Sequence, residues 1–346
     1  MRRVQAVTTT HPADELFAAL IEAVPPGPDR RFSQQLLRAA VDLVAQRPAT
    51  LDLKIAAAAL EEMGDAFAMF AHSKGLPKVT IFGSARTKEN DPLYAAAREV
   101  ARHLAEEGWM VITGAGPGIM QAGMEGAGRE HSIGVSVRLP FEQGANHIIA
   151  GDAKYVSMKY FFTRKLMLIK ESKGFVCLPG GFGTLDETFE LLTLTQTGKG
   201  MPVPIVFLDT PGDPYWETVH DFVGQQLVQR GLVSAADTGL YLITDDGEQA
   251  VREIIGFYRN YDSLRYVGAT LVVRLQQAPT EAQLAQLNER FGHLAGSGTI
   301  HAIGPMEPER KENDRLDLHR IAIPSAQHAY SDLRELIDLC NTFVDD

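Results

Sequence analysis

The amino-acid sequence predicts an α/β fold: a doubly wound parallel sheet, preceded by a helical segment and followed by a small α+β domain. From residue 78 to residue 260, short apolar runs alternate with segments of helical periodicity. Three of the apolar runs end in glycine-rich turns, which are Gly83-Ser84, Gly114–Gly118 and Gly180–Thr184. In a parallel sheet covered by helices on both faces, such turns meet beyond the carboxyl ends of the strands, where ligands bind.

Residues 1–76 are predicted to be a helical segment. Apolar residues recur at helical spacing in the stretches 16–21, 36–41 and 55–70, and a Pro-Gly-Pro break at 26–28 separates the first two. No catalytic constellation occurs there, so the segment is expected to be a helical cap or a dimerisation arm. Met1–Ala6 leads into no long apolar run, which argues against a signal peptide.

Residues 77–260 are predicted to form a Rossmann-like domain. The apolar runs predict strands at 79–82, 109–113, 133–137, 174–178 and 204–208. The helical stretches between and after them are 92–107, 119–130, 158–167, 185–197, 214–230 and 247–259. Apolar runs of this length are typical of strands that are buried on both faces.

Residues 261–346 change in character and predict a small α+β domain. Strands are expected at 270–273, 300–303 and 319–323, with a helix at 281–294 and a last helix around Leu333–Cys340. The charged stretch Glu307–Asp314 is interpreted as a solvated loop. The resulting β-α-β-β-α order fits a domain that serves assembly, with the binding of a regulator as the alternative.

Composition and charge exclude some classes of function. The chain has 346 residues, of which 45% are hydrophobic and 22% charged, and its formal net charge is -11. A charge of that sign argues against a nucleic-acid polymer as partner, because neutralising the phosphate backbone needs a basic face. Only Cys177 and Cys340 occur, so no disulfide framework is expected and a reducing cytoplasm fits. No run is long enough and apolar enough to span a membrane.

The most informative stretch is Leu178–Glu187, with the sequence Leu-Pro-Gly-Gly-Phe-Gly-Thr-Leu-Asp-Glu. It joins an apolar strand to a helix start, and its glycines let the backbone approach a ligand closely. Free N–H groups at a helix start favour an anion, so the loop can hold a phosphate with Glu187 beside it. The alternative is a plain tight turn in which Glu187 only favours the helix dipole.

A second segment, Met158–Met167, carries Arg164-Lys165 on a predicted helix just before the same strand. Together the Arg-Lys helix and the Pro-Gly-Gly-x-Gly-Thr-x-x-Glu loop resemble the LOG ("Lonely Guy") family, over about residues 77–258. The resemblance implies a nucleoside 5'-monophosphate phosphoribohydrolase that releases a free base and ribose 5-phosphate. It also implies that Arg164 and Glu187 are the catalytic pair, and that the protein is a homodimer or a higher homo-oligomer.

The candidate residues, the catalytic pair included, would bind an AMP-like nucleotide. Arg164 could bind the phosphate, orient Glu187 or contact the base. Glu187 could stabilise the positive charge that develops on the ribose, activate water or hold the ribose hydroxyls. Lys165 is interpreted as supporting or structural, and Met158 as a residue that borders the base or belongs to the core. The phosphate and nucleotide site is expected to include Gly83, Ser84, Gly116, Gly118, Gly180, Gly181, Gly183 and Thr184.

One further loop, Arg138–Gln143, contains the sequence Leu-Pro-Phe-Glu-Gln and resembles a loop that is common in bacterial members of the family. It is expected to be either a lid or wall of the pocket or a structural loop, and the sequence leaves both open.

Other enzyme classes are poorly supported. The stretch Gly114–Ile119 lacks the last glycine of a dinucleotide-binding fingerprint, and no P-loop or paired metal-ligand motif occurs. Lysine decarboxylation would need pyridoxal phosphate, which neither motif requires. No metal and no cofactor are therefore expected. The competing hypothesis is a nucleotide-binding sensor or carrier without turnover, and the preferred base, adenine or a cytokinin base, stays open.

Overall fold

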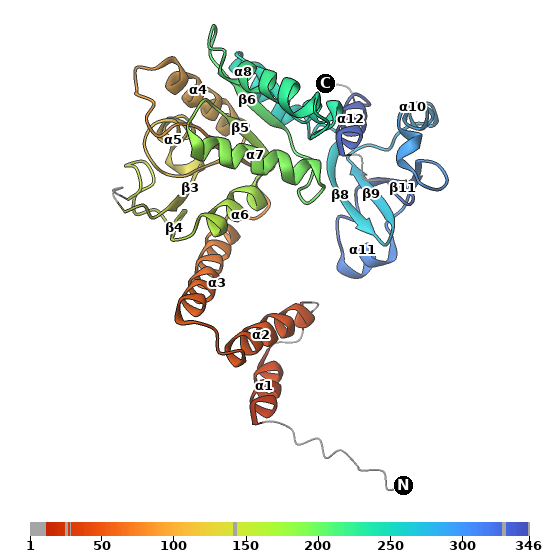
Figure 1. Ribbon diagram of the computed structural model, residues 1–346. Helices are drawn as coiled ribbons and strands as arrows, with labels where there is room; N and C mark the ends of the chain where they lie inside the picture. The colour runs from red at the N-terminus through yellow and green to blue at the C-terminus, as the bar shows by residue number, and fades with distance from the viewer. Residues whose placement is uncertain (1–11, 25–26, 28, 141–143, 327–329, 345–346) are drawn as a thin grey trace. The chain divides into compact units, whose positions relative to one another are not determined.

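A computed structural model describes residues 12–24, 27, 29–140, 144–326 and 330–344. The chain divides into two compact units, Met1–Leu60 and Glu61–Asp346, which are drawn in Figure 1 and are described one at a time. Met1–Ala6 and the prolines at 26 and 28 lie outside the described residues, as do Phe141–Gln143.

The first unit is helical, as expected. It contains α1 (Pro12–Ala23), α2 (Arg30–Ala45) and the start of α3 (Thr50–Ala71). The guanidinium of Arg38 lies 5.1 Å from the centre of the Phe17 ring, a cation–π contact that joins α1 to α2. No described residue of α2 is buried, so its apolar side chains remain open to other contacts. A role in assembly stays a prediction.

The second unit contains the predicted doubly wound sheet. Its seven strands are parallel and lie in the order β4-β3-β2-β1-β5-β6-β7. The chain runs outward from β1 to one edge and returns through β5 to the other, so the topological switch point lies between β1 and β5. The strands are β1 (Lys78–Phe82), β2 (Met110–Thr113), β3 (Ser132–Val137), β4 (Tyr155–Met158), β5 (Gly174–Cys177), β6 (Ile205–Leu208) and β7 (Leu242–Thr244).

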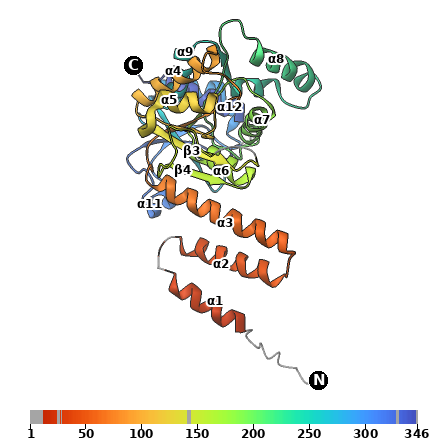
Figure 2. The same ribbon diagram turned by 90° about the vertical axis from the view of Figure 1, so that its left-hand side faces the viewer.

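Helices cover both faces of this sheet because its strands are apolar on both sides. In β6, for example, Val206 packs into one hydrophobic cluster and Phe207 into the other. The first cluster is covered by α4 (Pro92–Glu106), α5 (Ile119–His131) and α9 (Gly247–Gly256). The second is covered by the end of α3, α6 (Phe161–Glu171), α7 (Phe182–Gln196) and α8 (Tyr215–Phe222), as Figures 1 and 2 show.

Several element boundaries differ from the prediction. The helix expected over 158–167 is α6 but begins at Phe161, because Met158 is the last residue of the strand β4, and neither β4 nor β7 was predicted. Both are edge strands of three or four residues, too short for a periodic pattern to stand out. The helix expected from Leu185 begins at Phe182, so Thr184 lies inside it and is not its N-cap. The helix expected over 214–230 is α8 followed by a π-helical turn, Val223–Val228.

The C-terminal part is an α+β structure, as predicted, but with a different element order. Its antiparallel sheet, in the order β10-β11-β9-β8, includes one strand that was not predicted, β8. Glu307–Asp314 is not a plain solvated loop, because it begins with the helix α11 and its Glu309 is fully buried. The elements are β8 (Tyr261–Val267), β9 (Thr270–Leu275), α10 (Glu281–Phe291), β10 (His301–Ile303), α11 (Glu307–Glu312), β11 (His319–Ile323) and α12 (Tyr330–Asn341).

A polar junction ties this part to the parallel sheet. The Asn341 side chain accepts hydrogen bonds from the backbone N–H groups of Asn260 and Tyr261, both 2.9 Å, and donates to the Phe257 carbonyl at 2.7 Å. These bonds hold α12 against the end of α9. The domain boundaries at 76/77 and 260/261 remain proposals. In the part of the chain that the structure describes, no helix is both long and apolar enough to cross a membrane.

Candidate active site

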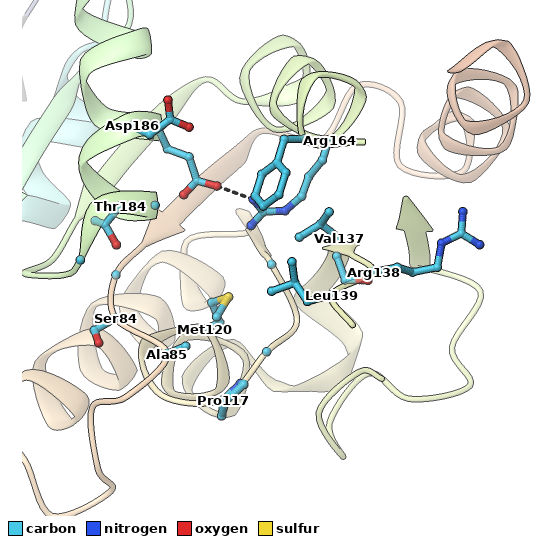
Figure 3. A pocket seen from close by; sticks show the side chains of 18 of the residues that line it. Ser84, Ala85, Pro117, Met120, Val137, Arg138, Leu139, Arg164, Thr184 and Asp186 are labelled. Atoms are coloured by element: carbon cyan, nitrogen blue, oxygen red, sulfur yellow. Dashed lines mark hydrogen bonds and ion pairs between the residues drawn. The ribbon is translucent and has the colours of Figure 1, made fainter. Parts of the chain in front are cut away.

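A cavity of about 800 Å³ lies beyond the carboxyl ends of β1, β2, β3 and β5. The three glycine-rich turns of the sequence contribute to it, together with the loop after β3 and side chains of α6 and α7. Figure 3 shows Ser84, Arg164 and Thr184 from these segments, and Met120 from α5, around the same space. The rim expected from the strand pattern is therefore present at the switch point of the sheet.

Hydrogen bonds between backbones join the first turn to residues that directly adjoin the other two turns. Ser84 donates its N–H to the Pro179 carbonyl at 3.2 Å and accepts at its own carbonyl from the Ile119 N–H at 3.0 Å. Gly118 makes this approach possible: its φ is +66°, and a Cβ there would lie 2.3 Å from the Ser84 carbonyl oxygen. A side chain at this position would be strained and would push the turns apart.

The start of α7 is open toward the cavity. Gly181 is the N-cap, and no side chain makes a capping hydrogen bond there. A Cβ at Gly181 or at Gly183 would meet no described atom within 4 Å, although both residues line the cavity. These two glycines therefore leave room above the first N–H groups of the helix, which carry partial positive charge. The result is a site suited to an anion such as a phosphate.

An ion pair between Arg164 and Glu187 forms one wall of the cavity. The guanidinium Nη1 of Arg164 donates to Oε1 of Glu187, and its Nε donates to the Val135 carbonyl at 3.0 Å. Figure 3 marks the ion pair with a dashed line. The two side chains are only 9% and 11% exposed. The guanidinium is thus fixed between the end of β3 and the first turns of α7.

The lack of a side chain at Gly114 leaves room for the Arg164 guanidinium. A Cβ at this position would lie 2.6 Å from Nη2 of Arg164 and 2.6 Å from the Met120 sulfur. The turn after β2 was expected to shape the nucleotide pocket, but this supporting contact with Arg164 was not predicted. It depends on two segments that are 50 residues apart in the chain.

Burial raises the pKa of the Glu187 carboxyl above its ordinary value, although the Arg164 guanidinium opposes the shift. The carboxyl lines the cavity. Because its pKa is raised, the transfer of a proton near neutral pH is less costly than for an exposed glutamate. A carboxylate and an anion site on the same helix end suit a substrate that carries a phosphate and develops positive charge.

The cavity brings together most, but not all, of the predicted site residues. Met158 is fully buried in the core beside α6, and Lys165 faces Asp186 and Glu190, with Nζ–O distances of 3.1 and 2.7 Å. Gly118 and Gly180 lie behind the lining and shape the turns. The predicted residues that do line the cavity are Gly83, Ser84, Gly116, Arg164, Gly181, Gly183, Thr184 and Glu187.

Other lining residues were missed by sequence reasoning. The hydroxyls of Ser136 and Tyr155 lie 2.8 Å apart on neighbouring strands, and the exposed Arg86 follows the first turn. Ser136 lies in the strand predicted over 133–137, but Tyr155 belongs to the unpredicted strand β4, so the pair could be found only together with that strand. Arg138 and Leu139 also line the cavity, in agreement with a wall of the pocket; the rest of that loop, Phe141–Gln143, lies outside the described residues.

Comparisons with known proteins find relatives of this chain. A family model described as "Possible lysine decarboxylase" matches residues 118–254. The chain is 32% identical over 142 residues to an Arabidopsis thaliana protein named "Probable cytokinin riboside 5'-monophosphate phosphoribohydrolase LOG6", covering 40% of this chain and 67% of that protein. It is 25% identical over 183 residues to a similarly named rice protein, LOG4, covering 51% of this chain and 75% of the rice protein.

Two solved structures are similar at a lower level. The molybdenum cofactor carrier protein of Chlamydomonas reinhardtii is 22% identical with a TM-score of 0.36, covering 52% of this chain and 98% of that one. The molybdenum cofactor binding protein of Rippkaea orientalis is 17% identical with a TM-score of 0.36, covering 52% of this chain and 95% of that one.

The matched region contains the Arg164 helix α6 and the loop that begins α7. The chain therefore belongs to the LOG family.

Proposed function

We propose that the protein is a nucleoside 5'-monophosphate phosphoribohydrolase, a hydrolase that acts on the N-glycosidic bond of AMP-like or cytokinin riboside monophosphates. The names of its relatives support this reaction. The buried ion pair of Arg164 with Glu187, beside an open helix N-terminus on a cavity of about 800 Å³, is the observation that carries the proposal. A cavity of this size is in the range of small-molecule sites.

The phosphate would bind at the start of α7. The N–H groups that follow Gly181 and the Thr184 hydroxyl would donate to its oxygens, and the Arg86 guanidinium lies on the same cavity. This arrangement explains why monophosphates, and not nucleosides, would be substrates: without the phosphate the helix end has no anion to hold.

Hydrolysis breaks the bond between ribose C1' and the base nitrogen. The electron pair leaves with the base, a water oxygen forms the new bond to C1', and the proton lost by the water is balanced by the proton gained by the base. Positive charge builds on the ribose in between, and the Glu187 carboxylate would stabilise it and receive the proton of the attacking water. Arg164, held by the Val135 carbonyl, would orient that carboxylate.

The decisive test is a chromatographic assay of the purified protein without added metal or cofactor. The panel holds nucleoside 5'-monophosphates, including AMP and N6-isopentenyl-AMP, with the matching nucleosides as controls. Release of free base and ribose 5-phosphate from the monophosphates alone would support the proposal, and the panel would name the base. Tight AMP binding without release would instead favour a sensor or carrier, and the proposed reaction would be wrong.

Tyr215 offers a prediction about the phosphate site. Its hydroxyl donates to the Gly180 carbonyl at 2.7 Å and so supports the glycine loop from α8. Tyr215→Phe should raise KM for the nucleotide severalfold with little change in kcat, and should lower the free energy of unfolding by about 1 kcal/mol. Tyr241→Phe is the matched control, because its hydroxyl lies beside His220 at 2.8 Å and away from the loop. Equal KM values in the two variants would contradict the prediction.

We also propose that the protein forms a homodimer or a higher homo-oligomer through α6 and α7. Phe162 and Leu166 are 53% and 45% exposed on α6, and Phe182 at the start of α7 is 93% exposed. Phe182 also lines the cavity, so a second copy over these helices would cover its mouth. A cytoplasmic location is the expected setting, and both cysteines are free and buried.

The assembly is tested by Leu166→Glu. A charge on the apolar surface of α6 should lower the mass measured by light scattering at micromolar concentration, because burying an unpaired carboxylate costs several kcal/mol. Leu232→Glu, at a residue that is 60% exposed and lies after α8, is the control and should keep the wild-type mass. A wild-type protein that is already a monomer would contradict the proposed assembly.

A further inference from the structure

A second cavity, of about 360 Å³, lies beyond the carboxyl ends of β6 and β7. It shares no lining residue with the cavity of the proposed reaction. Four carboxyl groups line it, from Asp209, Asp213, Glu217 and Asp245, and no lysine, arginine or histidine is among the lining residues. We call it the acidic cavity. Its charge suits a cation, but a cluster of acids alone does not make a site.

The second observation concerns Asp209, the first residue after β6. Its backbone N–H donates to the Thr244 carbonyl at 2.9 Å, and its Oδ2 accepts from the backbone N–H of Trp216 at 3.0 Å, so its position is fixed. The residue is only 3% exposed, and among the described residues its Oδ1 has no hydrogen-bond partner. A buried carboxylate oxygen without a donor is costly, which points to a donor that comes from outside the chain.

The neighbouring acids do not supply that donor. Asp213 uses its Oδ1 to accept from the Tyr215 N–H at 3.1 Å, and the Thr244 hydroxyl donates to Gln249 at 2.6 Å.

Among the described residues, no group of three or more His, Cys, Asp or Glu side chains is arranged to hold a metal ion. An ammonium group differs from a metal ion because its N–H donors can reach oxygens that lie farther apart, one bond at a time.

We propose that the acidic cavity binds a small organic cation through an ammonium group, with the Asp209 carboxylate as its main partner and Asp213, Glu217 and Asp245 adding attraction. This site is independent of the proposed reaction, because it uses other strands of the sheet. The cavity has room for a short amine, since its volume is many times that of a single water.

The pH dependence of binding follows from the groups that face Asp209. Burial, followed by repulsion from Asp213, Glu217 and Asp245, raises the pKa of Asp209 to about 6. Below that value Asp209 is neutral and offers less attraction to a cation. Binding should therefore be stronger at about pH 8 than at about pH 5, and at intermediate pH the cation should release a proton from the protein.

The experiment is calorimetric titration of the full-length protein with butane-1,4-diamine at low ionic strength and about pH 8, without nucleotide. Asp209→Asn keeps the size of the side chain and an oxygen for the Trp216 N–H, and should weaken binding about tenfold or more. Glu217→Gln should weaken it severalfold and covers the case in which the first variant does not fold. Glu248→Gln removes an acid from the first turn of α9, outside the cavity, and should change binding by less than about twofold.

The outcomes separate clearly. One diamine per chain, bound more weakly at about pH 5 and lost in Asp209→Asn, would support the site. No binding by the wild-type chain, or equal weakening by Asp209→Asn and Glu248→Gln, would overturn it, because the attraction would then be absent or general to an acidic surface. Binding of Mg²⁺ that excludes the diamine would also overturn it in favour of a metal site. No arm depends on turnover, so a failure here is distinct from a failure of the phosphoribohydrolase assay.

Discussion

Glu187→Gln is expected to abolish turnover while the nucleotide still binds. Glutamine has the same shape as glutamate and keeps an oxygen that can accept from Arg164, so the wall of the cavity should hold. It has no charge to stabilise the developing positive charge on the ribose and no carboxylate to take a proton from water. We expect kcat to fall by a factor of about 10³ or more, equivalent to about 4 kcal/mol of transition-state stabilisation.

Single-turnover kinetics with AMP would measure the loss, and calorimetric titration with AMP would measure binding. The matched control is Glu190→Gln, which changes a carboxylate on the same helix that pairs with Lys165 and does not line the cavity. It should keep turnover near that of the wild-type chain. If Glu187→Gln retained more than about a tenth of kcat, the mechanism proposed above would be wrong.

Much of this site could be predicted because it depends on local signals. In Leu178–Glu187 a strand end, glycines and a helix start follow one another within ten residues, and each has a recognisable pattern. The strands of a doubly wound sheet are continuous apolar runs, so β1, β2, β3, β5 and β6 were predicted within a few residues. The edge strands β4 and β7 were missed, and with them the hydroxyl pair of Ser136 and Tyr155.

Features that depend on contacts between distant residues could not be predicted. Glu309 belongs to a charged stretch that reads as exposed, yet it accepts from Arg274 and Arg320, at 2.9 and 3.1 Å, across 35 and 11 residues of sequence. Another feature of this kind is the open space beside Gly183, where an added Cβ would have no atom of a distant described residue within 4 Å, although the glycine lines the cavity. The unpartnered oxygen of Asp209 likewise follows from packing, not from any motif.

Arg164→Met is expected to lower the free energy of unfolding, and the loss should be larger at higher pH. Methionine fills similar space but leaves the Glu187 carboxylate buried without its partner. Burial already raises the pKa of Glu187, and Arg164 is the first of the groups that oppose this rise, so the pKa should climb further in the variant. Above that pKa an unpaired buried charge should cost about 3–5 kcal/mol of the free energy of unfolding, and turnover should be lost as well.

The sign of the pH effect separates this cause from a simple packing defect. A carboxyl whose folded-state pKa exceeds its unfolded value stabilises the fold most when it is protonated, below the unfolded value near about 4.3, and loses that contribution as pH rises through the folded-state pKa. Urea unfolding at several pH values should therefore show a small gap between wild type and Arg164→Met at about pH 5 and a larger one at about pH 8. The double variant Arg164→Met/Glu187→Gln is measured against Glu187→Gln, because neither chain has a carboxyl to titrate at this position, and that gap should not depend on pH. If the single and double variants lost the same stability at every pH, the loss would come from packing around the Val135 carbonyl, and Arg164 would not be what keeps Glu187 charged in the cavity.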